Sequence, residues 1–244
     1  MKINIFCLLF IISQIVYGQT KVIELKPIIG ETPDFSIKAQ REFAIKDSLI
    51  RKLEETREYE KLTKKEKEIL GKYEAFDSIW DILGNGCSWY CGGGPYKIIS
   101  SSFHKPEHDI FYDGTNAHDF SYKTSWVEGK PGYGIGEYLE YSFKNDSPRL
   151  TNIIIFNGII KSHQTWKYNT RVKLLEVFVN GSLYAILHLQ DTRAAQKFKL
   201  PEPLGRRKDG QDLVMKFVIK DIYKGEKYDD TAITELYFDG IDVH

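Results

Sequence analysis

Residues 124–143 read TSWVEGKPGYGIGEYLEYSF and combine a glycine-rich loop with a strand pattern. In the second half, apolar residues alternate from Leu139 to Phe143, as in a strand with one buried face. In the first half, Trp126 and Glu128 precede a loop that holds four glycines. These glycines do not follow a strand and open a helix, which argues against a dinucleotide-binding loop. The stretch therefore predicts a binding loop on a β scaffold.

The β pattern continues through the rest of the chain. The apolar phase switches between Leu174 and Leu175, which predicts a β-bulge. Asn180-Gly181 is the strongest hairpin signal in the sequence. About eight strands without βαβ spacing predict a mainly β fold, an antiparallel β-sandwich or jelly roll. The predicted strands are 96–101, 137–143, 151–157, 171–179, 183–190, 196–200, 212–223 and 233–243.

The chain begins with the pattern of a secretory signal peptide. Lys2 precedes an apolar run over residues 3–16, and Gly18 supplies a small residue at the predicted cleavage point. A transmembrane anchor is the alternative, but the run is shorter than the roughly 20 apolar residues that a span needs. We therefore expect residues 1–18 to be removed and the protein to be secreted or periplasmic.

A linker and a helical segment are expected before the β pattern. Residues 19–33 contain prolines and few periodic apolar residues, which indicates a linker or extended arm, and residues 34–83 are typical of helices. The sequence from Thr63 to Glu66 is a capping box that starts a second helix. One apolar face of that helix is expected to pack on the chain's own β domain, with a coiled-coil partner as the alternative. This face comprises Ile69, Tyr73, Phe76, Trp80 and Leu83.

Two cysteines remain after the predicted signal peptide. Cys87 and Cys91 stand four residues apart among glycines, and in an exported protein this favours a local disulfide. A zinc half-site lacks a second cysteine pair, and a redox motif normally has two intervening residues rather than three.

Aromatic and polar residues in predicted loops indicate a sugar-binding site rather than a catalytic one. No nucleophile motif, metalloprotease motif or phosphate loop accompanies the six histidines, so the chain is predicted not to be an enzyme. A formal net charge of zero argues against nucleic acid or an anionic membrane as the partner. The alternative for Trp126 or Trp166 is a place at the end of the core. The candidate ligand-binding residues are Trp126, Glu128, Asn157, Lys161, Trp166, Arg171, Tyr228 and Asp229.

Five motifs occur in an order that resembles a known family. They are Trp126-Val-Glu-Gly, Gly134-Ile-Gly-Glu137, Asn157-Gly with Lys161-Ser, Asn169-Thr-Arg-Val-Lys173, and Lys227-Tyr-Asp-Asp-Thr-Ala-Ile-Thr-Glu235. Together they resemble the discoidin-like, galactose-binding-like glycan-binding module of bacterial NAD-glycohydrolase-type toxins. The resemblance covers about residues 87–243 and leaves the helices outside it. It implies a jelly roll over residues 84–244 that holds a glycan or another extracellular ligand, and it does not imply NAD hydrolysis.

The same resemblance implies a structural calcium ion as the possible cofactor. The matching residues are Asp113, Thr124 and Glu235, which offer the oxygen ligands that calcium prefers. The loop between Gly114 and Thr124 is longer than the family pattern, and Asp119 is a candidate replacement ligand. The alternative for Glu235 is a surface charge beside core residues.

Three functions are compatible with these observations. The first is an exported non-catalytic module for a glycan or another extracellular ligand. The second is a protein-interaction or assembly factor that contacts its partner through residues 34–83. The third, ranked well below both, is a hydrolase acting on a nucleotide or a sugar.

Overall fold

The computed structural model describes residues 22–108 and 110–243. The predicted signal peptide therefore lies outside the described residues. Within those ranges the chain forms eleven strands and three α-helices. No helix in the described part of the chain has the length and apolar character required to cross a membrane.

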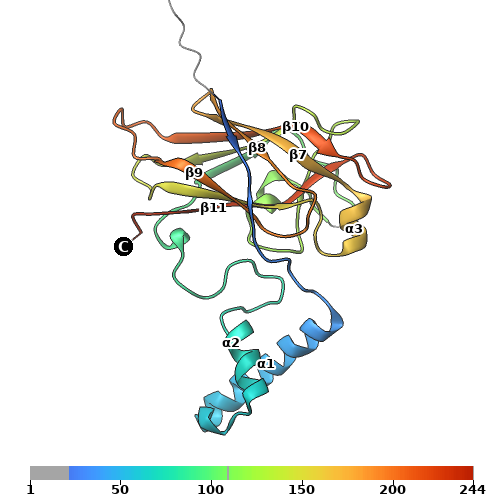
Figure 1. The fold of residues 1–244 in the computed structure, drawn as a ribbon, viewed down its shortest axis with the longest axis vertical. Helices are drawn as coiled ribbons and strands as arrows, with labels where there is room; N and C mark the ends of the chain where they lie inside the picture. Colours follow the sequence, from blue (N-terminus) through green and yellow to red (C-terminus); the bar gives the residue numbers. More distant parts are fainter. Residues whose placement is uncertain (1–21, 109, 244) are drawn as a thin grey trace, which may run out of the picture.

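Nine strands follow the helical segment, and their order is that of a β-sandwich (Figure 1). One half has the order β9-β6-β11, with β4 beside β11, and the other has β3-β5-β10-β7-β8. The strands are β3 (Lys97–Ser100), β4 (Trp126–Val127), β5 (Tyr138–Phe143), β6 (Leu150–Asn157), β7 (Thr170–Val179), β8 (Ser182–His188), β9 (Gln196–Leu204), β10 (Leu213–Tyr223) and β11 (Thr231–Gly240). A short parallel pairing of β11 with β7, at Thr231 and Ala232, joins the halves. The predicted β-sandwich is confirmed.

Both halves contribute side chains to one core. The alternating residues of β5 and β10, from Leu139 to Phe143 and from Met215 to Ile219, pack there with residues of β6 and β11 such as Ile155 and Phe238. The indole of Trp126 is also in this core and is 0% exposed. Burial of alternate side chains is thus the main physical reason why these segments form a sandwich.

Two predicted local features of β7 are found. Asn180 and Gly181 both have positive φ, at 47° and 82°, as a tight hairpin turn between β7 and β8 requires. The pairing of β7 with β10 shifts register on both sides of the Leu174–Asp221 pair, which leaves first Lys220 of β10 and then Lys173 of β7 as the extra residue. An irregularity is therefore present beside the predicted position, with one extra residue on each strand.

The segment predicted as a linker or arm adds a short strand to each half of the sandwich. Strand β1 (Ile23–Leu25) pairs parallel with β8, and β2 (Ile28–Ile29) pairs antiparallel with β9. A contact between Glu24 and His188 accompanies the β1 pairing. The arm therefore lies along an edge of both halves.

Helices α1 (Ile37–Thr56) and α2 (Lys64–Tyr73) pack on each other and form a helical hairpin, which stands apart from the sandwich in Figure 1. The capping box of Thr63 and Glu66 is present. The expected packing of α2 on the β domain is wrong, because its Ile69 and Tyr73 face Phe43 of α1.

The predicted length of α2 is also wrong, since the helix ends at Tyr73 and leaves Phe76, Trp80 and Leu83 outside it. Local hydrogen bonds replace the helical ones beyond that point. The backbone N–H of Ser78 donates to Asp81 Oδ2 at 2.6 Å, and that of Trp80 donates to Ser78 Oγ at 3.2 Å.

Three short 3₁₀ helices complete the fold, η1 (Tyr59–Lys61), η2 (Trp89–Cys91) and η3 (Gly114–Ala117). The second contains Cys91, whose Sγ atom lies 3.3 Å from that of Cys87. This contact is longer than the roughly 2.0 Å of a disulfide bond. The disulfide therefore stays a prediction.

We expect Trp126→Ala to destabilise the fold by about 3–5 kcal/mol, because it removes a fully buried aromatic side chain from a packed core. Urea unfolding followed by fluorescence or circular dichroism measures this loss. Tyr133→Ala, which changes an exposed aromatic ring in the neighbouring glycine-rich loop, is the matched control. Equal stability of the two variants would contradict the core position of Trp126.

We expect Cys87 and Cys91 to be oxidised to a disulfide in protein prepared under oxidising conditions, because a small displacement of the two sulfur atoms suffices. Alkylation followed by mass spectrometry should label neither residue before reduction and both after it. Full labelling without reductant would show that the pair is not bonded.

Candidate ligand-binding site

The predicted ligand-binding residues do not converge on one surface. The prediction that Trp126 contacts a ligand is wrong, because its ring is enclosed in the core and its Nε1–H donates to the carbonyl of Ser102 at 2.8 Å. Four of the other candidates are also buried, and each is engaged in holding the backbone.

Glu128 and Asn157 are fully buried hydrogen-bond partners of backbone groups. The Glu128 carboxylate accepts from the N–H of Lys130 at 2.8 Å and of Thr231 at 3.3 Å, and burial raises its pKa. The Asn157 side chain bonds both polar backbone atoms of Val172, donating to the carbonyl at 2.7 Å and accepting from the N–H at 2.9 Å. The prediction of ligand contact is therefore wrong for both side chains.

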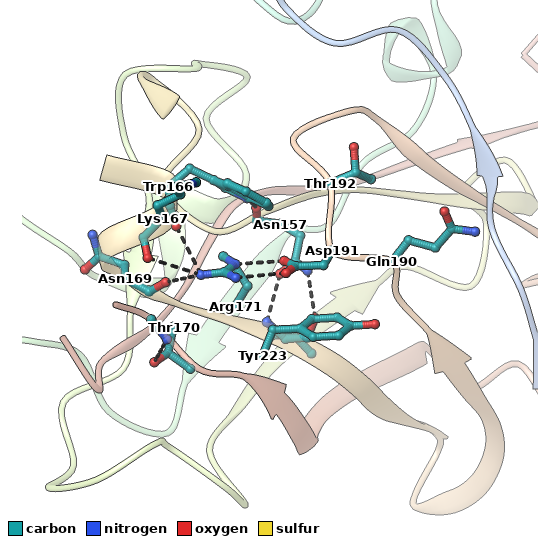
Figure 2. A network of polar contacts seen from close by, with 12 residues as sticks. Asn157, Trp166, Lys167, Asn169, Thr170, Arg171, Gln190, Asp191, Thr192 and Tyr223 are labelled. Atoms are coloured by element: carbon teal, nitrogen blue, oxygen red, sulfur yellow. Dashed lines mark hydrogen bonds and ion pairs between the residues drawn. The ribbon is translucent and has the colours of Figure 1, made fainter. Parts of the chain in front are cut away.

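Arg171 and Trp166 are buried and belong to a second network of polar contacts, whose carboxylate, Asp191, is partly exposed (Figure 2). The Arg171 guanidinium donates to both carboxylate oxygens of Asp191 at 2.9 Å and to the carbonyl of Asn169 at 2.9 Å. Its Cζ lies 4.5 Å from the centre of the Trp166 ring. Trp166 lies in helix α3 (His163–Tyr168), and its Nε1–H donates to the carbonyl of Asn157 at 3.0 Å. These groups are fully engaged within the protein, so the prediction that they bind a ligand is also wrong.

The remaining candidates are exposed, and two of them line a cavity of about 410 Å³. These are Lys161 and Tyr228, and the cavity also includes Thr124 from the predicted calcium set. Asp229 is exposed but is not a lining residue, whereas its neighbour Asp230 is. Four loops that are distant in the sequence form the walls. The lining residues are His104, Glu107, Ile110, Phe111, Tyr112, Lys123, Thr124, Ser125, Val127, Ile159, Lys161, Thr165, Asn169, Tyr228 and Asp230.

This cavity combines aromatic surface with polar groups that are available to a ligand. Tyr228 is 42% exposed, and the Nζ atom of Lys227 lies 4.8 Å from the centre of its ring. Neither the Lys161 ammonium nor the Asp230 carboxylate forms a salt bridge with another residue in the described ranges. Burial raises the pKa of Asp230, and the nearby His104 opposes that shift. The backbone N–H of His104 donates to the carbonyl of Val127 at 2.8 Å, which fixes this loop to β4.

The wall formed within residues 104–108 and 110–112 was not predicted as a site. Its signal in the sequence is a run in which His104, Glu107, Ile110, Phe111 and Tyr112 follow no strand or helix period. Ile110 and Phe111 are indeed exposed. Such a mixture of charged and aromatic residues in an irregular segment is the pattern that could have identified it.

Glu235 occupies a different position, beneath the loop of residues 119–122. Its side chain is fully buried, so the alternative of a surface charge is wrong. Oε1 accepts from the N–H of Phe120 at 3.3 Å, whereas Oε2 is buried and has no hydrogen-bond partner among the described residues. Burial, followed by the charge of Asp119, raises the pKa of Glu235 well above its ordinary value.

Two further predicted calcium ligands have polar partners of their own. Asp119 accepts from the Thr124 hydroxyl at 2.6 Å, and its charge contributes to the raised pKa of Glu235. Asp113 instead caps η3 by accepting from the N–H of Thr115 at 2.9 Å. In the described part of the chain no three His, Cys, Asp or Glu side chains are grouped as a metal site. A cation here would therefore need hydroxyl or carbonyl oxygens as well.

A comparison with protein families identifies the larger part of the chain. The family model described as the NAD glycohydrolase translocation F5/8 type C domain matches residues 89–239, more than half of the chain. No curated protein matches the sequence.

Three solved structures are similar to parts of this chain. The CBM32-1 and CBM32-2 domains of Clostridium perfringens ZmpB are 17% identical, with a TM-score of 0.43, over 60% of this chain and 34% of that one. This chain thus spans about a third of that protein. The family 32 CBM of Clostridium perfringens NanJ, in complex with galactose, is 16% identical, with a TM-score of 0.41, over 58% and 91%.

The third structure is the NAD+-glycohydrolase translocation domain of Streptococcus pyogenes. It is 24% identical, with a TM-score of 0.33, over 47% of this chain and 96% of that one. The family model covers the region from η2 to the end of β11, where the sequence motifs are found. The protein belongs to the family of NAD glycohydrolase translocation F5/8 type C domains.

Proposed function

We propose that the protein is an exported, non-catalytic module that binds a glycan in the cavity lined by Lys161, Tyr228 and Asp230. The single observation that carries this proposal is an exposed aromatic ring beside an ammonium and a carboxylate that the described residues leave unpaired. An aromatic face packs against the apolar face of a sugar, and the charged groups bind its hydroxyls.

Rigid support for the cavity favours binding. Residues 104 and 127 are joined by a backbone hydrogen bond, and α3 is capped by Ser162, whose hydroxyl accepts from the N–H of Thr165 at 3.0 Å. The Arg171 network holds the end of the same helix through the carbonyl of Asn169. Walls that are already ordered lose little conformational entropy when a ligand binds.

We expect Tyr228→Ala and Lys161→Ala each to weaken glycan binding about tenfold, or roughly 1.4 kcal/mol, because each removes one direct contact. A glycan array identifies a ligand, and isothermal titration calorimetry then measures its affinity for each variant. Tyr59→Ala is the control, since Tyr59 is similarly exposed but lies in η1 of the helical segment. Unchanged affinity in both cavity variants would refute this site, and turnover of the glycan would refute a non-catalytic role.

We also propose that Glu235 and Asp119 hold a calcium ion, with the Thr124 hydroxyl as a further oxygen donor. The buried, unpartnered Oε2 of Glu235 beside a second carboxylate supports this, because a cation would compensate both charges. A bound calcium ion would supply positive charge and order the residues around it.

The proposed calcium site has a specific pH dependence. Because the pKa of Glu235 is raised in the folded state, metal-free protein should lose stability as the pH rises above the ordinary value of 4.5. Calcium at a hundred times its Kd should add about 2.7 kcal/mol at neutral pH. Thermal unfolding between pH 4 and 8, with calcium or with EGTA, measures both effects. Glu235→Gln should reduce both the pH slope and the calcium effect, and a wild-type melting curve insensitive to calcium would contradict the site.

A further inference from the structure

The loop of residues 119–122 is held on two sides by different parts of the chain. On one side, the N–H of Phe120 donates to Glu235 Oε1. On the other side, the carbonyl of Phe120 accepts from the N–H of Ile82 at 2.9 Å, and the N–H of Tyr122 donates to the carbonyl of Trp80 at 2.8 Å. A single residue, Phe120, thus connects the proposed calcium site to the segment that follows the helical hairpin.

Aromatic contacts reinforce this attachment. Trp80 stacks on Phe35, with ring centres 4.5 Å apart, and Phe35 also contacts Tyr122 at 5.3 Å. Tyr122 in turn meets Phe156 of β6 edge to face at 5.0 Å. Phe35 precedes α1 and Trp80 follows α2, so both ends of the helical hairpin meet at Tyr122. Residues 80–82 and Phe35 therefore form a docking segment between the hairpin and the sandwich.

Helices α1 and α2 depend on this docking segment for their position. Their apolar faces are occupied by each other, in the clusters around Phe43 and Leu49. A cavity of about 260 Å³ lies between the hairpin, the arm and Tyr122, so packing at the junction is incomplete. The hydrogen bonds to residues 120 and 122, together with the packing of Ile82 and Tyr122 against Phe156, attach the end of the hairpin to the sandwich.

The backbone conformation of Phe120 makes the loop of residues 119–122 depend on its contact with Glu235. Its φ of 57° is in the left-handed region, which is unfavourable for a bulky residue and must be imposed by surrounding contacts. One such contact is its N–H bond to Glu235. Asp119 directly precedes Phe120, and Glu235 accepts the Phe120 N–H, so a cation held by both carboxylates would act directly on this loop.

We infer that a calcium ion at Glu235 and Asp119 controls the docking of the helical hairpin, residues 37–73, through the loop of residues 119–122. This inference rests on the proposed calcium site. Calcium orders the loop in the conformation that presents the Phe120 carbonyl and the Tyr122 N–H to residues 80–82. Since linkage is reciprocal, docking of residues 80–82 also increases calcium affinity.

Hydrogen exchange on the full chain tests the coupling, with calcium chloride in one sample and EGTA in the other. The amides of Ile82 and Tyr122 should exchange about fivefold more slowly, or slower still, with calcium. Amides within α1 and α2 whose protection depends on their mutual packing should change much less. Glu235→Gln should abolish the calcium effect, whereas Asp209→Asn, at a remote pair with Arg207, should preserve it.

The effect of docking on calcium affinity is tested with Trp80→Ala. This substitution removes the stacking on Phe35 and leaves Glu235 intact. This variant should bind calcium several-fold more weakly by calorimetry. Calcium binding to wild-type protein without a change in exchange at residues 80–82 and 120–122 would overturn the coupling and leave the calcium site standing. Absence of calcium binding to wild-type protein would overturn both, while glycan binding at Lys161 and Tyr228 is measured separately.

Discussion

Buried backbone groups must find hydrogen-bond partners, and this requirement is most demanding where the two halves of the sandwich separate. Strands β11 and β7 pair only at Thr231 and Ala232, so beyond these residues their backbone groups do not form hydrogen bonds with each other. Side chains supply the missing partners. Asn157 bonds both backbone groups of Val172, Glu128 accepts from Thr231, and the Thr234 hydroxyl donates to the carbonyl of Gly158 at 2.6 Å. The connection between the two halves of the sandwich depends on these buried polar side chains.

The same requirement explains which parts of the site were predictable. Glu128, Asn157 and Arg171 are polar residues at strand ends, and a sequence shows this placement without showing whether the side chain faces a ligand or the protein's own backbone. All three face the backbone or a neighbouring carboxylate. Lys161 and Tyr228, which line the cavity, were chosen because they were expected in irregular segments, and their role in binding stays a prediction. His104 and Asp230 were missed because their proximity arises only when loops far apart in the chain meet.

The fold was more predictable than the site because burial imposes a period on the sequence. Alternation in β5 and β10 identified strands correctly, since only one face of each lies in the core. The apolar spacing beyond Tyr73 was misleading, because the helical period continues in the sequence through a segment in which Ser78 and Asp81 form local, non-helical hydrogen bonds. The two strands within the arm were not predicted, because two or three residues show no period and their pairing depends on strands elsewhere.

The arm has a consequence for the order in which the molecule is assembled. Ile23 pairs with Ala185 and Ile28 with Lys197, so each contact spans most of the chain. These edges do not exist until β8 and β9 have joined the sandwich. Because contacts of such long range form slowly, the arm is expected to pair last. Strands β1 and β2 thus join a sandwich that later parts of the chain have already formed. In a truncated chain that lacks β8 and β9, these two strands would have no partner strand.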